Sequence, residues 1–339
     1  MRFPASFILL ALAACSSGNS DRSGGVPTQA VGATRPSGCG EGDTQCLSDR
    51  YFAGYAEDKQ KPCDLAPPTE RIDGKLELAL YAATTIDDTA VAEEGRLLQS
   101  YYARYGLTFV TSQGVHETKL ATAMSGTEAE LVQALKDGGI DPNAKSLTEA
   151  EKKRATAIVG GVVYGPLREF VRATSSPVQK HISVAVLEHV ATAEIAKLAG
   201  LPEGAVIAGL GLSPKVFREI AGDDSSKNLF DAIGLPEDFT PVLFIGHTDI
   251  KAKAKAASVV VAHELGHCMG LQHTKIPGNL MTQYSASNAC RPELDNDQLG
   301  IIREGVATDN ATLVIDQAEL VERLAKAPDA IVAKLFARP

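Results

Sequence analysis

Tryptophan is absent from this chain of 339 residues, and only 5% of its residues are aromatic. No uninterrupted apolar run reaches the roughly 20 residues that a membrane-spanning helix needs. Lysine and arginine form no basic block, and the net charge of −9 is spread along the chain, so we expect no nucleic-acid partner. With 44% hydrophobic and 22% charged residues, the composition is that of a globular protein with a sizeable core.

Histidine is also scarce, with seven in all, but three of the seven lie within residues 263–273. This segment reads HELGHCMGLQH. On a helix, His263 and His267 stand one turn apart on the same face, where two imidazoles can bind one metal ion. The spacing therefore predicts a helix that carries two ligands of a zinc site.

Three further residues of this segment supply features that a catalytic zinc site needs. Glu264 is too close to His263 to join the pair as a ligand, but it can take a proton from a water on the metal. Gly270 can adopt a left-handed conformation and turn the chain back, so that His273 becomes the third ligand. Three histidines leave a coordination position for water, which is typical of a single catalytic Zn²⁺.

A methionine follows the third histidine at a fixed distance. Residues 277–282 read PGNLMT, in which turn residues precede Met281, eight positions beyond His273. Together with the pattern H-E-x-x-H-x-x-G-x-x-H, this resembles the metzincin clan of zinc metallopeptidases, whose Met-turn lies beneath the metal. The spacing is most similar to that of matrixins, although Thr274 stands where matrixins usually have serine.

The resemblance implies a fold and a reaction. The fold is α/β (α+β), a metzincin-like zincin domain with a mixed twisted sheet, an edge strand over the active-site cleft, a zinc helix, a Met-turn and a C-terminal helix. The reaction is hydrolysis of a polypeptide substrate by metal-activated water, with Glu264 as general base and no organic cofactor. Oligomeric state is left open.

The resemblance also implies a substrate-binding edge strand. Residues 206–214 are glycine-rich and end in proline, a composition typical of sheet edges. Ala208, Gly209, Leu210 and Gly211 are the candidates for pairing with the substrate backbone. Residues 182–190, also of strand composition, compete for this role.

Tyr284 lies three residues after Met281. Some metzincins place a tyrosine near the methionine, where it binds zinc or stabilises the oxyanion, but usually at a spacing of two. Lining of the S1′ pocket is therefore the preferred role for Tyr284.

Hydrophobic periodicity outlines the rest of the domain, which we place at residues 72–306. Strands are predicted at 75–84, 107–111 and 242–245, and helices at 87–105, 258–269 and from 295 to about 306. Residues 118–177 form a helical insertion with two capping boxes, Thr127 with Glu130 and Ser146 with Glu149. We expect this insertion to pack on the sheet, with the cleft wall as the alternative, and residues 307–339 to form a helical tail.

The N-terminus has the pattern of an export signal. Residues 1–14 are a short apolar signal peptide, and the letters LAAC ending at Cys15 resemble the bacterial lipobox. We therefore expect lipidation of Cys15, a flexible tether over 15–38 and anchoring to the outer membrane or cell surface; the alternative is a plain secretory signal with a chance cysteine.

An exported chain permits disulfides. Five cysteines remain after Cys15. A pre-domain segment over residues 39–71 contains three of them, Cys39, Cys46 and Cys63. The preferred pairing is Cys39 with Cys46 and Cys268 with Cys290, although spacing alone does not establish it. This leaves Cys63 as a structural or unpaired thiol, or as a latency thiol of the kind found in matrixin pro-segments.

Two other functions fit the same motif. The first is a surface-binding lipoprotein whose zinc site has no turnover, and the intact Glu264 argues against it. The second is a zinc hydrolase of another bond, such as an amide of a cell-wall peptide. Peptide digestion separates these alternatives from the endopeptidase.

Overall fold

The structure is a computed structural model of the chain, and it describes most of the domain that contains the zinc motif. The described residues are 63–87, 91, 101–110, 115–175, 181–201, 207–213, 234–235, 239–251, 257–282, 290, 292–307 and 318–336. Cys15, Cys39, Cys46 and Tyr284 lie outside them.

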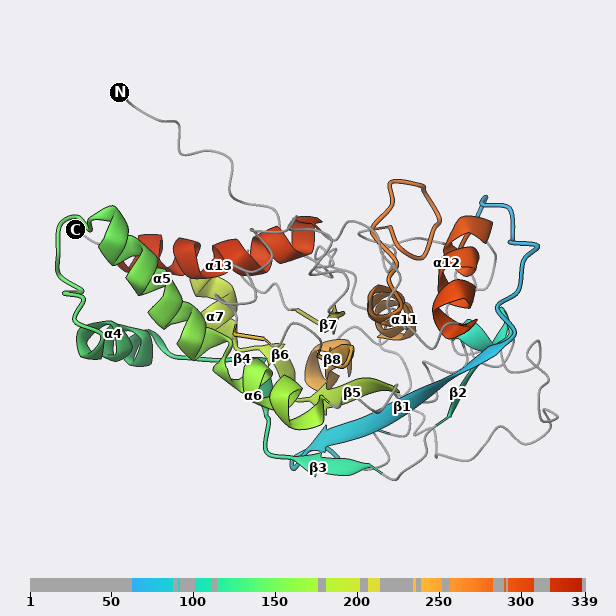
Figure 1. Ribbon diagram of the computed structural model, residues 1–339, viewed down its shortest axis with the longest axis horizontal. Coiled ribbons are helices and arrows are strands. Elements are labelled where there is room, and N and C mark those ends of the chain that lie inside the picture. Colours follow the sequence, from blue (N-terminus) through green and yellow to red (C-terminus); the bar gives the residue numbers. More distant parts are fainter. Residues whose placement is uncertain are drawn as a thin grey trace, which may run out of the picture.

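A twisted, mostly parallel sheet forms the centre of the molecule (Figure 1). Its order is β2-β1-β5-β8-β7, and β3 pairs with the C-terminal part of β1 beside β2. The strands are β1 Gly74–Ala83, β2 Leu107–Val110, β3 His116–Thr118, β5 His181–Leu187, β7 Gly209–Leu212 and β8 Val242–Gly246. Only β7 runs antiparallel to its neighbour among these strands. This mixed sheet confirms the predicted fold class.

Burial along the strands explains their position in the sheet. In β1, exposed Lys75 and Glu77 alternate with less exposed apolar residues in the first half, as in a half-covered strand. Strands β5 and β8 are buried along their whole length, which fits their central place between two layers of helices.

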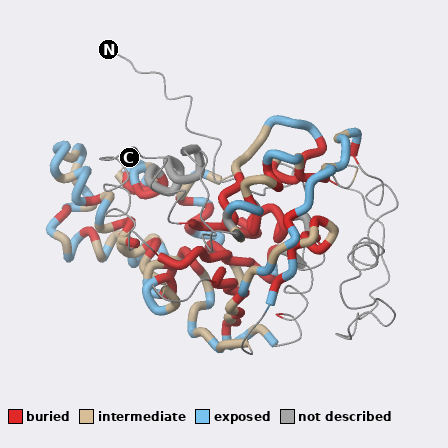
Figure 2. Tube along the Cα trace, turned by 45° about the vertical axis from the view of Figure 1, so that its right-hand side comes forward, coloured by how far each residue is buried: buried red, intermediate tan, exposed pale blue. Residues whose placement is uncertain are grey.

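The sheet has a hydrophobic core on each face. One core joins alternate residues of β1, β5 and β8 to α11 (Ala257–Cys268) and α12 (Asn296–Ala307). The other core joins the opposite side of β5, β7 and β8 to the remaining long helices. Figure 2 shows buried chain running through the middle of the molecule between these layers.

The helices of the second layer come from two distant parts of the chain. They are α4 Glu128–Asp137, α5 Glu149–Val163, α6 Gly165–Thr174, α7 Ala193–Leu198 and α13 Ala318–Phe336. Helices α4, α5 and α6 thus pack on this face of the sheet. Helix α13 is more than a tail, because Ile331, Val332 and Leu335 are buried in this core. Two short strands, β4 Thr122–Met124 and β6 His189–Ala191, form a separate two-stranded parallel sheet. The short helix α10 is His247–Lys251.

One predicted capping box is correct and the other is shifted. The Thr127 side chain accepts from the Glu130 amide and Glu130 caps Thr127 in return. The second box uses Thr148 with Glu151 instead of Ser146 with Glu149. Both pairs have the same spacing, so the sequence pattern alone does not distinguish them. The Thr148 backbone is extended, and its side chain accepts from the Glu151 amide.

The predicted disulfide between Cys268 and Cys290 is wrong. Cys290 bonds to Cys63, with their Cα atoms 4.9 Å apart, so Cys63 is not a latency thiol. Cys268 stays free and buried because its sulfur points into the core, 3.4 Å from the Val242 carbonyl. The pairing of Cys39 with Cys46 lies outside the described residues.

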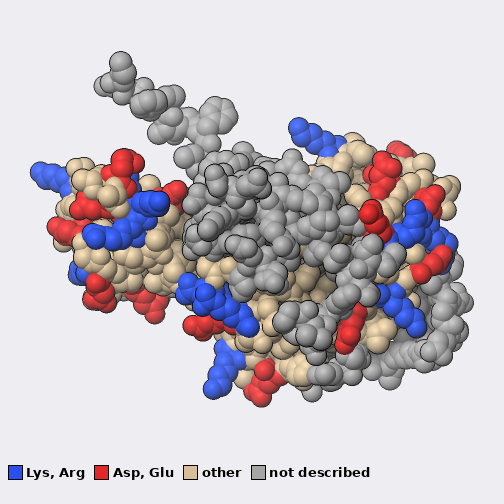
Figure 3. Space-filling model, viewed as in Figure 1, with Lys and Arg blue, Asp and Glu red and all other residues tan. Residues whose placement is uncertain are grey.

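Charges on the face shown in Figure 3 are mixed, with lysine and arginine interspersed among aspartate and glutamate. Among the described helices, none combines the length and hydrophobicity needed to cross a bilayer.

Candidate metal centre and active site

The three motif histidines are positioned by α11 and by the turn after it. The helix ends at Cys268, and Gly270 follows with φ of +87°. This left-handed conformation, which glycine adopts at little cost, reverses the chain. The Leu271 amide donates to the Gly266 carbonyl at 2.9 Å, and His273 returns toward the helix as predicted.

The ring nitrogens of the histidines converge on one point. The Nε2 atom of His263 lies 3.1 Å from that of His267 and 3.1 Å from that of His273. A tetrahedral zinc ion with bonds of about 2.0–2.1 Å places its nitrogen ligands about 3.3 Å apart. The three residues therefore have the spacing to hold a metal ion.

Backbone carbonyls fix the tautomers of the two helical histidines. Nδ1 of His263 donates to the Leu280 carbonyl, and Nδ1 of His267 donates to the Leu271 carbonyl, each at 2.8 Å. A carbonyl only accepts, so the proton resides on Nδ1 and the Nε2 lone pair is available to a metal.

Burial keeps these rings neutral. Burial and the neighbouring His273 lower the pKa of His263 to about 3. Burial and the two other histidines lower the pKa of His267 well below its usual range. Neutral imidazole is the form that binds metal, so no proton has to be removed at neutral pH.

The predicted Met-turn lies directly against α11. Met281 is fully buried, and its amide donates to the Asn279 side chain at 2.8 Å. Its sulfur occupies the place that a Cβ on Gly266 would need, 2.6 Å away. Met281 therefore packs against the part of α11 that lies between the two helical histidines.

Gly266→Ala should therefore lower the free energy of unfolding by about 1–3 kcal/mol, because the new methyl group overlaps the Met281 sulfur. Gly300→Ala on α12 is the matched control, since a Cβ there meets nothing within 4 Å. The control should be neutral or stabilising by up to about 1 kcal/mol. Thermal unfolding of both variants measures the difference, and equal melting temperatures would contradict the prediction.

Glu264 is buried beneath the sheet edge, with 1% of its surface exposed. Its Oε2 atom accepts a hydrogen bond of 3.1 Å from the Gly211 amide of β7.

Strand β7 pairs with β8 on one side, and no described strand pairs with its other side. The competing residues 182–190 fall mainly in β5, which lies between β1 and β8. Of the two candidate strands, β7 is the one at the sheet edge.

A buried ion pair, which no sequence motif indicates, lies behind the Met-turn. The Glu293 carboxylate, 1% exposed, pairs with Arg104 and accepts from the Tyr105 hydroxyl at 2.8 Å. The Glu293 backbone donates to Gly278 and accepts from Leu280. Because nearly 190 residues separate the partners, no local pattern indicates this contact.

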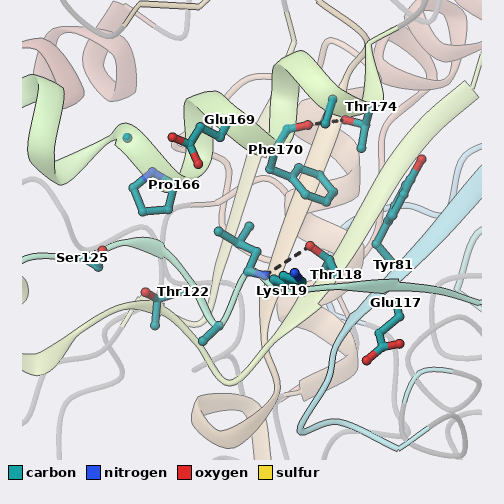
Figure 4. Close-up of a pocket in the computed structure, with 14 residues that line it drawn as sticks. Tyr81, Glu117, Thr118, Lys119, Thr122, Ser125, Pro166, Glu169, Phe170 and Thr174 are labelled. Atoms are coloured by element: carbon teal, nitrogen blue, oxygen red, sulfur yellow. Dashed lines mark hydrogen bonds between the residues drawn. The ribbon is translucent and has the colours of Figure 1, made fainter.

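A pocket of about 670 Å³ lies elsewhere, between α6 and the segment 117–122 (Figure 4). Tyr81 and Phe170 meet there edge to face, with ring centres 5.1 Å apart. None of the three clustered histidines lines it, so it is separate from the metal centre.

Residues 220–304, which include the three histidines and Met281, match the family model described as Matrixin. Over these residues the chain is similar to the matrixins, a family of zinc metallopeptidases. One solved structure that it resembles is metalloproteinase-II from Bacteroides fragilis, at 10% sequence identity and a TM-score of 0.32. That similarity covers 78% of this chain and 60% of the other chain. No curated protein matches.

Proposed function

We propose that this metallopeptidase is an endopeptidase with one zinc ion, held by His263, His267 and His273, and with Glu264 as its general base. The observation that carries the proposal is that the Nε2 atoms of His267 and His273 each lie 3.1 Å from that of His263, while the neighbouring residue Glu264 is buried. A purely structural zinc site is normally closed by four protein ligands, and the described residues supply three in this cluster.

Bound zinc would supply a Lewis acid that makes a water nucleophilic at neutral pH and polarises the scissile carbonyl. Glu264 then takes the proton released by the attacking water and delivers it to the departing amine nitrogen. Its burial excludes bulk water from the carboxylate, which strengthens its electrostatic interactions. The Nδ1 hydrogen bonds of His263 and His267 hold the two rings in the ligand tautomer throughout.

Strand β7 supports binding of an extended substrate. The Ala208 carbonyl accepts from the Gly246 amide at the end of β8. In an antiparallel pair, successive residues direct their backbone N–H and C=O groups alternately toward the partner strand and toward the open side. The Gly211 amide points to Glu264 and so belongs to the open side. A peptide adding along this edge would be held by its main chain next to the general base.

Digestion of a defined peptide library by the zinc-loaded full chain tests the proposal. We expect internal cleavage that a chelator abolishes and added zinc restores, with the products identified by mass spectrometry. Cleavage confined to terminal residues would contradict an endopeptidase. Bound zinc with no peptide hydrolysis would favour the binding lipoprotein, and release of amides from cell-wall peptides alone would favour the other hydrolase.

A further inference from the structure

The two glycines of β7 lie in unusually close contact with Glu264. A Cβ on Gly209 would lie 2.5 Å from Cγ of Glu264 and 3.3 Å from its Cδ. A Cβ on Gly211 would lie 2.2 Å from the Glu264 carbonyl oxygen and 3.1 Å from Cβ of His267. Contacts this short do not occur between real side chains, so each position excludes any residue larger than glycine.

The alternation of the strand explains why glycine falls at these two positions. Residues two apart in a strand point to the same face, and Gly209 and Gly211 face α11. Leu210 and Leu212 face the opposite way and are buried in the core of the other helical layer. The sequence Gly-Leu-Gly-Leu thus fills one face of the sheet and leaves the other open for the zinc helix.

We infer that Gly209 and Gly211 are positioning residues for the Glu264 carboxylate, a role that rests on the proposed function of that residue. Gly209 provides the space that the Glu264 side chain occupies. Gly211 provides the amide that holds Oε2 at 3.1 Å. The sheet edge and the general base are consequently fixed to each other, and displacement of β7 displaces the carboxylate.

The two glycines contact different parts of Glu264, which permits a discriminating experiment. The nearest obstacle for Gly209 is side chain, whereas the nearest obstacle for Gly211 is backbone. Glu264→Ala removes the first and leaves the second. The Cβ of residue 264, which alanine retains, lies 3.4 Å from a Cβ on residue 209, an ordinary van der Waals distance.

The experiment is a double-mutant cycle on the full, zinc-loaded chain. We expect Gly209→Ala to lower the melting temperature by roughly 5 °C in the wild-type background, as overpacking of a core does. In the Glu264→Ala background the decrease should vanish. Gly211→Ala, the matched control, should lower the melting temperature in both backgrounds. An equal effect of Gly209→Ala in both backgrounds, or none in either, would overturn the inference.

Kinetics supply a second readout that a general loss of stability does not produce. Below the melting temperature, Gly209→Ala should lower kcat by about 10-fold or more, because small displacements of a catalytic group are costly. Zinc content and KM should stay unchanged, and a rise in KM at constant kcat would contradict positioning of the base. The melting cycle needs no substrate, so a chain that cleaves no peptide refutes the proposed function while the contact is still tested.

Discussion

Glu264→Gln should lower kcat for peptide hydrolysis by about 10²–10⁴-fold, the range that a general base contributes. Glutamine has the shape of glutamate and its oxygen can still accept from the Gly211 amide, but it cannot take a proton from water. The three histidines and their backbone partners are unchanged. Zinc content, measured by atomic emission on the purified protein, should therefore stay at the wild-type level.

Glu117→Gln is the control for this substitution, because Glu117 is an exposed carboxylate on β3. It should leave kcat unchanged. If Glu264→Gln kept most of the wild-type kcat while retaining zinc, another group would have to accept the proton. If the variant lost its zinc, the change in activity would report metal binding and would not test the base.

The metal centre could be predicted from sequence because its parts are local. His263, His267 and His273 lie within one helix and one turn, so their convergence depends on helical periodicity and on a single left-handed glycine. Hydrophobic periodicity also predicts several strands and helices. Of these, β5, β8 and α11 begin and end within a few residues of the predicted positions. Strands β1 and β2 pair in parallel, as a crossover connection between consecutive strands of one sheet favours.

Contacts between distant segments could not be predicted in the same way. Cys63 and Cys290 are 227 residues apart, and several pairings of the cysteines fit the sequence equally well. Ser146 and Thr148 both begin a capping-box pattern, so the spacing alone does not decide which of them is the N-cap. The fit of Gly209 against Glu264 depends on the distance between a strand and a helix, which no sequence pattern specifies.

Glu293→Ala should destabilise the fold by about 3–5 kcal/mol, because it leaves the Arg104 charge buried without its partner. Arg104 has a relative side-chain exposure of 10%, and its guanidinium also lies 4.7 Å from the centre of the Tyr105 ring. For a domain of this size the loss corresponds to a decrease of roughly 10 °C in melting temperature. Thermal unfolding measures it directly.

Glu149→Ala is the matched control, because Glu149 also pairs with a basic residue, Lys152, but its side chain is 90% exposed. An exposed ion pair contributes at most about 1 kcal/mol, so the control should hardly change the melting temperature. Replacing both members of the buried pair by apolar residues, Arg104→Met with Glu293→Leu, should recover much of the stability lost in Glu293→Ala. A double variant no more stable than Glu293→Ala would show that the carboxylate acts mainly through its hydrogen bond with Tyr105. The Leu280 amide donates to the Glu293 carbonyl, and the Leu280 carbonyl accepts from Nδ1 of His263. Because Glu293 is thus linked to a metal ligand through Leu280, Glu293→Ala should also weaken zinc retention.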